Sequence, residues 1–181
     1  MAKRLAIAVL AVVLGFASAA QADPFTFDLV FDAGLGGSGS GTLVANDLGA
    51  GRFGVTDGTL RVVGGAAAGD YTLYPNPTPW AAFISPSGSF QTNNVLYFPS
   101  NPVFDVYGIL FVQNGGTGRE VNLWGNSASN YSFYSSPSTY YWDVAIDGFQ
   151  SVTITPVPEP ASSLLLMGMG LAGLLWKRKS L

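Results

Sequence analysis

The chain of 181 residues contains no cysteine and no histidine. Without cysteine it can form no disulfide, and thiol catalysis and cysteine-based zinc sites are excluded. Without histidine it can hold no Ser-His-Asp triad and perform no imidazole acid–base catalysis. The sequence offers no other clear constellation of catalytic or metal-binding residues, so we predict no enzyme activity, no cofactor and no metal site.

Charge is also scarce, and it is unevenly distributed. Charged residues make up 10% of the chain, against about a quarter in an average soluble domain. The segment 23–156 contains no lysine and carries three arginines against ten acidic residues, a net charge of −7. Because an acidic surface repels the phosphates of nucleic acids, we predict no nucleic-acid partner.

Residues 1–22 have the composition of a secretory signal peptide. Two basic residues precede an apolar run at 5–16, and small residues follow. The run has 12 residues, fewer than the roughly 20 of a membrane-spanning helix. We therefore predict a signal helix that engages the Sec machinery and that signal peptidase removes before Asp23, with a cut after Ala19 as the alternative. The residues that define this signal are Lys3, Arg4, Ala20 and Ala22.

The segment 23–156 has the alternation of half-buried β-strands. Every second residue from Phe25 to Phe31 is large and apolar, which is the period of a strand with one buried face. Short strands joined by glycine-rich turns, with no helical period between them, favour an all-β fold. We predict an antiparallel β-sandwich or jelly-roll-like domain, flanked by the N-terminal signal helix and a single C-terminal transmembrane helix. Further strand patterns lie at 40–46, 52–56, 59–63, 95–98, 106–113, 119–125, 131–134, 140–147 and 151–155.

Two regions leave the strand pattern open. The apolar phase changes across Asp57-Gly58, which predicts either a tight hairpin turn or a bulge within one strand. Six prolines fall within 75–102, which indicates a long irregular excursion with a short strand near Val95–Phe98. After the excursion, 106–113 and 119–125 are expected to pair as a hairpin.

Two motifs that suggest chemistry have simpler interpretations. Residues 34–39 match G-x-G-x-x-G, but a strand pattern follows instead of the helix that a dinucleotide site requires, so we expect an inter-strand loop. Asp143 and Asp147 would lie on one strand face about 13 Å apart at ~3.3 Å per residue. That exceeds the ~5–9.5 Å between the carboxylates of glycoside hydrolases. Solvated carboxylates are the favoured interpretation; a carboxylate glycoside hydrolase and a calcium site both stay open as minor alternatives.

The domain is rich in aromatic residues. Exposed aromatic rings can stack on sugar rings, whereas buried rings fill a β core, which is the default interpretation here. The candidates for glycan stacking are Trp80, Trp124 and Trp142.

The segment 157–181 reads VPEPASSLLLMGMGLAGLLWKRKSL and has three ordered elements. A Pro-Glu-Pro triplet is followed by an apolar run at 161–176, which as a helix would span about 24 Å of a ~30 Å hydrocarbon core. A basic cluster then follows, and it should stay cytoplasmic. We predict a single-pass inner-membrane precursor whose middle segment is exported. The triplet is Pro158, Glu159 and Pro160, and the basic cluster is Lys177, Arg178 and Lys179.

Together with the signal peptide, these elements resemble the PEP-CTERM protein-sorting signal of Gram-negative bacteria. The resemblance implies a partner, a membrane protease of the exosortase type, that recognises Pro158-Glu159-Pro160 and cuts near it. It also implies delivery to the cell surface or outside, often in bacteria that make exopolysaccharide. The middle segment is more loosely similar to small exported proteins with this tail, which implies no known activity.

The functional hypothesis is therefore a non-enzymatic exported protein of the cell surface or extracellular matrix. The alternative is a module that binds carbohydrate, such as exopolysaccharide, through exposed aromatic rings.

Overall fold

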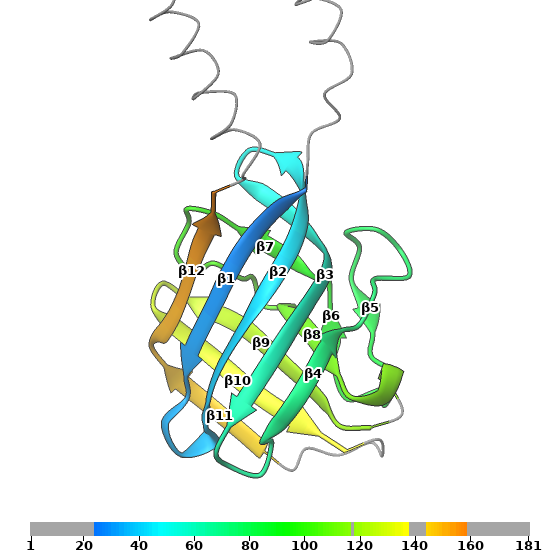
Figure 1. Ribbon diagram of the computed structural model, residues 1–181, viewed down its shortest axis with the longest axis vertical. Coiled ribbons are helices and arrows are strands. Elements are labelled where there is room, and N and C mark those ends of the chain that lie inside the picture. The colour runs from blue at the N-terminus through cyan, green and yellow to red at the C-terminus, as the bar shows by residue number, and fades with distance from the viewer. Residues whose placement is uncertain (1–23, 117, 138–143, 159–181) are drawn as a thin grey trace, which may run out of the picture.

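The computed structural model describes residues 24–116, 118–137 and 144–158. These residues form β-strands and two short 3-10 helices, η1 and η2 (Figure 1). The all-β prediction is confirmed, whereas the two terminal helices expected from the sequence lie outside the described residues. The elements are β1 (Phe25–Asp32), η1 (Gly34–Gly36), β2 (Ser38–Gly49), β3 (Arg52–Val63), β4 (Gly69–Leu73), β5 (Phe83–Ile84), β6 (Gln91–Thr92), β7 (Val95–Tyr97), β8 (Ile109–Val112), η2 (Asn114–Gly116), β9 (Glu120–Ser127), β10 (Asn130–Ser136), β11 (Val144–Phe149) and β12 (Ser151–Val157).

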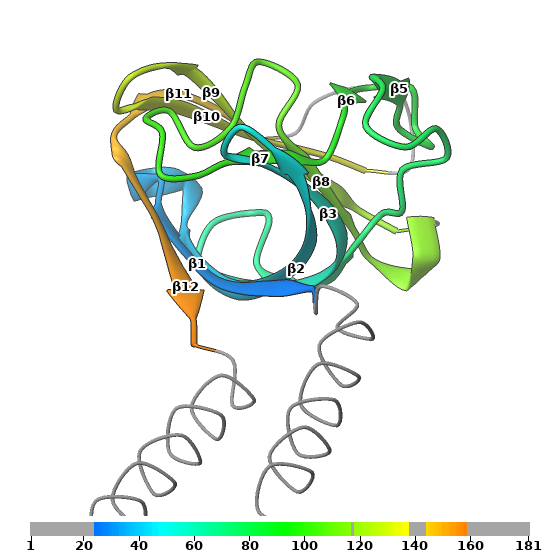
Figure 2. The ribbon, with the colours of Figure 1, turned by 90° about the horizontal axis from the view of Figure 1, so that it is seen from above.

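Ten of these strands belong to one antiparallel sheet, which curls into two facing layers. Its order is β11-β10-β9-β8-β4-β3-β2-β1-β12, and β7 pairs separately with β3. Figure 2 shows β1 and β2 on one side of the molecule and β9, β10 and β11 on the other. We call β12 and β1–β4 the front layer, and β8–β11 the back layer. The expected sandwich is thus made by one continuous sheet.

The two edges of this sheet are joined by a single residue. β11 pairs with β10 at one edge, and β12 pairs with β1 at the other. Only Gln150 separates the two strands along the chain. Since a one-residue connection cannot span a flat ten-stranded sheet, the sheet has to curl until its edges meet.

The space between the layers is filled by the apolar faces of the strands. Phe27, Leu29 and Phe31 alternate with exposed residues along β1, as the sequence predicts, and each is at most 1% exposed. Phe31 reaches across to Phe133 on β10, with 5.1 Å between ring centroids. Burial of such rings supplies most of the free energy that holds the layers together, roughly 1.5–3 kcal/mol for each large side chain.

The phase change at Asp57-Gly58 is a bulge. β3 continues through it, and its pairing with β2 shifts between Val44 and Ala45, which face Asp57 and Val55. Thr56 is the extra residue, so the side chains that follow it change face. The bulge alternative is confirmed, and the hairpin alternative is wrong.

The proline-rich excursion covers part of the outer face of the back layer, mainly over β8. It contains the β5–β6 hairpin and β7, which confirms the expected short strand near Val95–Phe98. Phe83 and Phe90 from the excursion pack with Leu110 and Val112 of β8 to form a second, smaller core. This core buries one part of the outer face of the back layer. The remaining part of this outer face, on β9, β10 and β11, is not fully covered and has half-buried and exposed side chains.

The glycine-rich loop has no nucleotide-binding geometry. Gly34–Gly36 forms η1, and β2 begins at Ser38, so the loop leads into a strand. The expected hairpin after the excursion is also present, because β8 pairs with β9.

Candidate functional site

An aromatic and polar cluster lies on the outer surface of β9, β10 and β11. Pairing places Trp124 opposite Ser132 and Ser132 opposite Asp147, so these three side chains form a row across the strands. Tyr134 on β10 and Asn126 on β9 adjoin this row. We call Trp124, Asn126, Ser132, Tyr134 and Asp147 the β9–β11 face.

Both rings of this face are held in place by hydrogen bonds. Trp124 Nε1 donates to Asn126 Oδ1 at 3.0 Å, and Tyr134 Oη donates to Asp147 Oδ2 at 2.8 Å. Ser132 Oγ donates to the other carboxylate oxygen of Asp147 and accepts a bond from Asn126 Nδ2. The ring centroids lie 4.6 Å apart and the ring planes are inclined by 56°. The two half-buried rings therefore form a fixed, angled pair.

Tyr134 is a stable hydrogen-bond donor at neutral pH. Burial raises its pKa above the ordinary 10.0, and the hydrogen bond to Asp147 and the charge of Asp147 add to this. The neutral phenol therefore contributes stability below pH 10 that is lost as the pH rises through the raised pKa.

The three tryptophans predicted from the sequence have different surroundings. Trp124 is half-buried on the β9–β11 face. Trp80 is also half-buried, but its ring lies directly on Gly54, where an added Cβ would collide with it. This contact uses one ring face in packing. Trp142 lies outside the described residues.

A hydrogen-bonded network fixes the excursion beside this face. Asp105 accepts bonds from Asn93 Nδ2 at 2.7 Å and from the Tyr97 hydroxyl at 3.1 Å, and the backbone N–H of Tyr107 donates to its other oxygen. Burial raises the pKa of Tyr97, and the charge of Asp105 and its hydrogen bond add to this. The network holds Tyr107 over β9, where its carbonyl accepts a bond from Asn122 Nδ2.

Asn122 is the least satisfied polar group near the cluster. Its side chain is 2% exposed, and its Oδ1 has no hydrogen-bond partner within the described part of the chain. Pairing places it opposite Tyr134 on the same side of the strands. Since a buried acceptor without a partner costs roughly 1–3 kcal/mol, this oxygen lowers the local stability beneath the excursion.

Glu120 anchors the excursion at the first residue of β9, on the same outer face as Asn122 and Trp124. It is fully buried, and its two oxygens accept bonds from the Ser87 N–H at 2.7 Å and the Ser87 hydroxyl at 2.6 Å. This places a carboxylate under the turn between β5 and β6, where it has a structural role.

We expect Glu120→Ala to lower the free energy of unfolding by about 2–4 kcal/mol, because it leaves the Ser87 N–H without its acceptor and opens a cavity. Glu120→Gln keeps an acceptor and should cost only about 1 kcal/mol. Urea unfolding followed by tryptophan fluorescence measures both variants. Equal, small losses would contradict this role.

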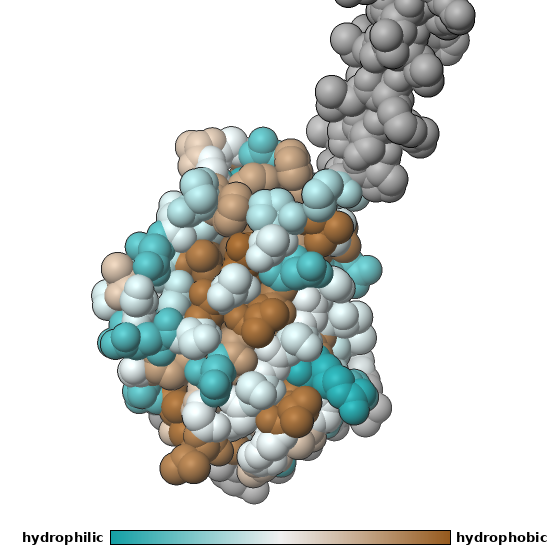
Figure 3. Space-filling model, turned by 60° about the vertical axis from the view of Figure 1, so that its left-hand side comes forward, coloured by the Kyte–Doolittle hydropathy of each residue, from teal (hydrophilic) through white to brown (hydrophobic). Residues whose placement is uncertain are grey.

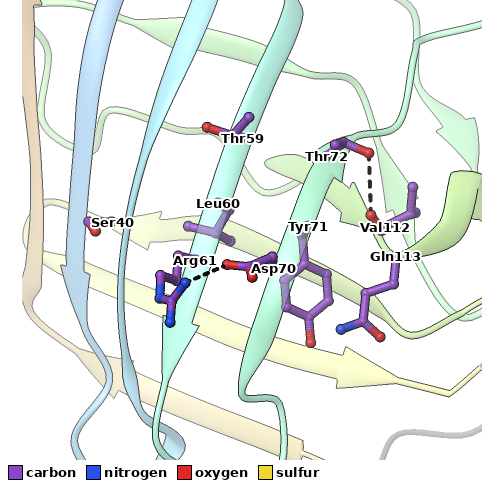
Figure 4. A pocket seen from close by; sticks show the side chains of 9 residues that line it. All are labelled: Ser40, Thr59, Leu60, Arg61, Asp70, Tyr71, Thr72, Val112 and Gln113. Atoms are coloured by element: carbon purple, nitrogen blue, oxygen red, sulfur yellow. Dashed lines mark hydrogen bonds and ion pairs between the residues drawn. The ribbon is translucent and has the colours of Figure 1, made fainter.

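Two hollows open on the surface away from the β9–β11 face. The first, of about 360 Å³, lies over β3 and β4 and is lined by hydroxyl groups and an ion pair (Figure 4). Arg61 and Asp70 make that pair at 3.3 Å, and both side chains are more than 70% exposed, so solvent weakens it. The second, of about 280 Å³, lies between β12 and the loop at 98–103. Neither collects the aromatic and amide groups of the β9–β11 face.

The carboxylates suggested by the sequence do not form a visible catalytic pair. Asp143 lies outside the described residues, so its separation from Asp147 stays a prediction. Asp147 is exposed, as expected for a solvated carboxylate, but it also orients Tyr134 and Ser132. Within 24–116, 118–137 and 144–158, no three acidic side chains are grouped so that they could hold a metal ion.

The beginning and the end of the domain lie side by side. β1 and β12 are antiparallel, and Thr26 pairs with Val157. Pro156 lies on β12 and pairs with Phe27 of β1. Because β12 is an edge strand, the missing N–H of proline is tolerated there. Pro158 is the first residue after β12, and it is exposed. The other residues of the predicted signals lie outside the described residues: Lys3, Arg4, Ala20, Ala22, Asp23, Glu159, Pro160, Lys177, Arg178 and Lys179.

Apolar residues also reach the surface on this side of the molecule. Val30 on β1 is 51% exposed and Val157 is 36% exposed. Figure 3, which brings the β12 side forward, shows the apolar surface interrupted by polar residues. Among the described residues, no helix has the length and apolarity needed to cross a membrane.

These features define an all-β domain whose last edge strand runs straight into a Pro-Glu-Pro segment. Residues 156–179 match the family model of the PEP-CTERM protein-sorting motif. The chain thus carries this sorting signal, which marks an exported protein that an exosortase processes. Comparisons with curated proteins and with solved structures found no match.

The sequence singled out Trp124 and Asp147 separately, but it did not predict the other three members of the face or that the five side chains meet. Asn126, Ser132 and Tyr134 follow the alternation of two adjacent strands, which is a usable signal. Their meeting with Asp147 depends on register shifts in β10, between Asn130 and Tyr131 on one side and Tyr131 and Ser132 on the other. Those shifts leave no mark in a single sequence.

Proposed function

We propose that the mature domain is a non-enzymatic protein of the cell surface or extracellular matrix. The observation that carries this proposal is the sorting motif at 156–179, which begins inside the last strand of the folded domain. The precursor enters the Sec pathway and loses its signal peptide before Asp23. It then spans the inner membrane once, with Lys177, Arg178 and Lys179 in the cytoplasm, until an exosortase cuts near Pro158-Glu159-Pro160.

The composition supports a non-catalytic role. The chain has no histidine or cysteine, and the two least exposed acidic side chains of the described residues hold the excursion in place. Asp105 holds the excursion, and Glu120 binds Ser87 beneath it. Asp147 is the acidic group that combines exposure with a fixed aromatic environment, so it is the carboxylate to test.

We expect the exported protein, collected from a host that has an exosortase, to release no reducing ends from neutral or acidic polysaccharides above a buffer blank. A colorimetric assay for reducing ends measures this. Release by the wild-type protein that disappears in Asp147→Asn would establish a hydrolase and overturn the non-enzymatic proposal.

Carbohydrate binding is the second candidate function. It is supported by Trp124, whose half-buried ring lies beside amide, hydroxyl and carboxylate groups on an outer surface. Trp80 supports it less, because one face of its ring packs on Gly54. A binding role and a matrix role are compatible, since a matrix protein has to adhere to something in the matrix.

A further inference from the structure

The β9–β11 face combines the two kinds of group that recognise a sugar ring. A pyranose presents apolar C–H faces, which stack on aromatic rings, and a rim of hydroxyls, which need donors and acceptors. Trp124 and Tyr134 supply the rings. Asn126 and Asp147 are both exposed beside them and supply polar groups.

The cluster keeps hydrogen-bonding capacity for a ligand. Two ionised carboxylate oxygens accept about four bonds, and Asp147 uses one oxygen for Ser132 and the other for Tyr134. Each oxygen therefore retains a lone pair for a ligand hydroxyl. The exposed Asn126 Oδ1 accepts one bond, from Trp124 Nε1, and can accept another.

The face is also preorganised and accessible. Because hydrogen bonds from their polar atoms hold Trp124 and Tyr134, little side-chain freedom is lost when a ligand binds. On the β11 side, Tyr134 is paired with Ala145, whose small, exposed side chain leaves room over that strand.

Charge determines the class of sugar. The segment 23–156 carries a net charge of −7, and Asp147 places a carboxylate within the cluster. A polymer of uronic acids would be repelled by both, whereas hydroxyl groups of a neutral sugar can donate to Asp147.

We propose that the β9–β11 face is a binding site for a neutral polysaccharide. It would contact sugar rings through Trp124 and Tyr134, and sugar hydroxyls through the carboxylate of Asp147 and the amide oxygen of Asn126. The inference rests on the proposed surface function, because a protein delivered outside the membrane encounters such polymers.

Native gel electrophoresis of the exported protein in gels that contain dissolved polysaccharide tests this site. The probes are galactomannan, hydroxyethylcellulose and dextran as neutral polymers, and alginate and hyaluronan as acidic ones. We expect at least one neutral polymer to retard the wild-type protein and neither acidic polymer to do so. Trp124→Ala should weaken that binding at least tenfold, and Asp147→Asn by about three- to tenfold.

Phe25→Ala is the matched control, because Phe25 is a 40% exposed aromatic residue on the opposite layer. It should bind like the wild-type protein. If Trp124→Ala unfolds, Trp124→Phe and Tyr134→Phe replace it in the binding assay. Each keeps a ring but removes one hydrogen bond to the polar groups, so each should weaken binding. The inference is overturned if no neutral polymer retards the protein, if only acidic polymers do, or if retardation is unchanged in the variants of Trp124, Tyr134 and Asp147.

Surface delivery is measured on the same cells by accessibility to added protease. Normal delivery without polysaccharide binding would refute the inferred binding site and leave the proposed surface function intact. Failure of the wild-type protein to reach the surface would instead remove the proposed function.

Discussion

A Glu159→Ala chain is expected to accumulate in the membrane as a precursor that retains residues 161–181. Prolines on both sides of Glu159 are expected to favour an extended backbone there, which would help its presentation to a processing enzyme. Removing the carboxylate leaves the apolar run and the basic cluster unchanged, so insertion should proceed normally. We expect the processed fraction to fall at least tenfold, measured by intact mass and by immunoblots of membrane and extracellular fractions.

Asp28→Ala is the matched control for this variant. Asp28 is an exposed carboxylate on β1, and it pairs with Thr155, the residue directly before the sorting motif. Its loss should leave processing unchanged. If Glu159→Ala were shortened and exported as efficiently as Asp28→Ala, recognition of Pro-Glu-Pro would be refuted.

Gly108→Ala is expected to lower the free energy of unfolding by about 2–5 kcal/mol. Gly108 has a φ of +67°, a conformation that costs other residues about 1–2 kcal/mol. An added Cβ would also collide with the backbone of Leu123 and with Trp124 on β9. Overpacking of this kind costs a further ~1–3 kcal/mol. Urea unfolding measures the loss.

Gly34→Ala separates the two contributions. Gly34 has a similar φ of +59°, but an added Cβ would meet nothing within 4 Å. We therefore expect it to lose only about 1–2 kcal/mol. Equal losses in the two variants would mean that Gly108 does not lie as close to β9 as the structure places it.

Most of the strands could be predicted from the sequence because alternation is a local signal. Phe27, Leu29 and Phe31 fix the buried face of β1 without reference to any other strand. The bulge at Asp57-Gly58 was also visible as a change of phase, although the sequence could not distinguish it from a turn. Only the partner strand, through Val44 and Ala45, decides between the two.

The closure of the sheet and the anchoring of the excursion could not be predicted. Closure depends on Gln150, a single residue between β11 and β12, which form the two opposite edges of the sheet. The excursion is held by Asp105 and Glu120, whose partners are side chains and N–H groups distant in sequence or in irregular segments. From the sequence alone, polar residues of this kind are expected to be solvent-exposed loop residues, because their partners are not visible in the local pattern.

The overlap of the sorting motif with β12 has a mechanical consequence. The match begins at Pro156, and β12 ends at Val157. A cut near Pro158-Glu159-Pro160 therefore leaves the closing strand of the sheet intact. Release from the membrane should not unfold the domain, because the pairing of β12 with β1 lies wholly before the triplet.

The intact mass of the wild-type protein recovered from the cell surface or medium tests the central claim most directly. The account predicts a chain that begins at Asp23 and has lost residues 161–181. A surface or membrane product whose mass still includes those residues, in a host with an active exosortase, would contradict it and establish the C-terminal segment as a permanent anchor.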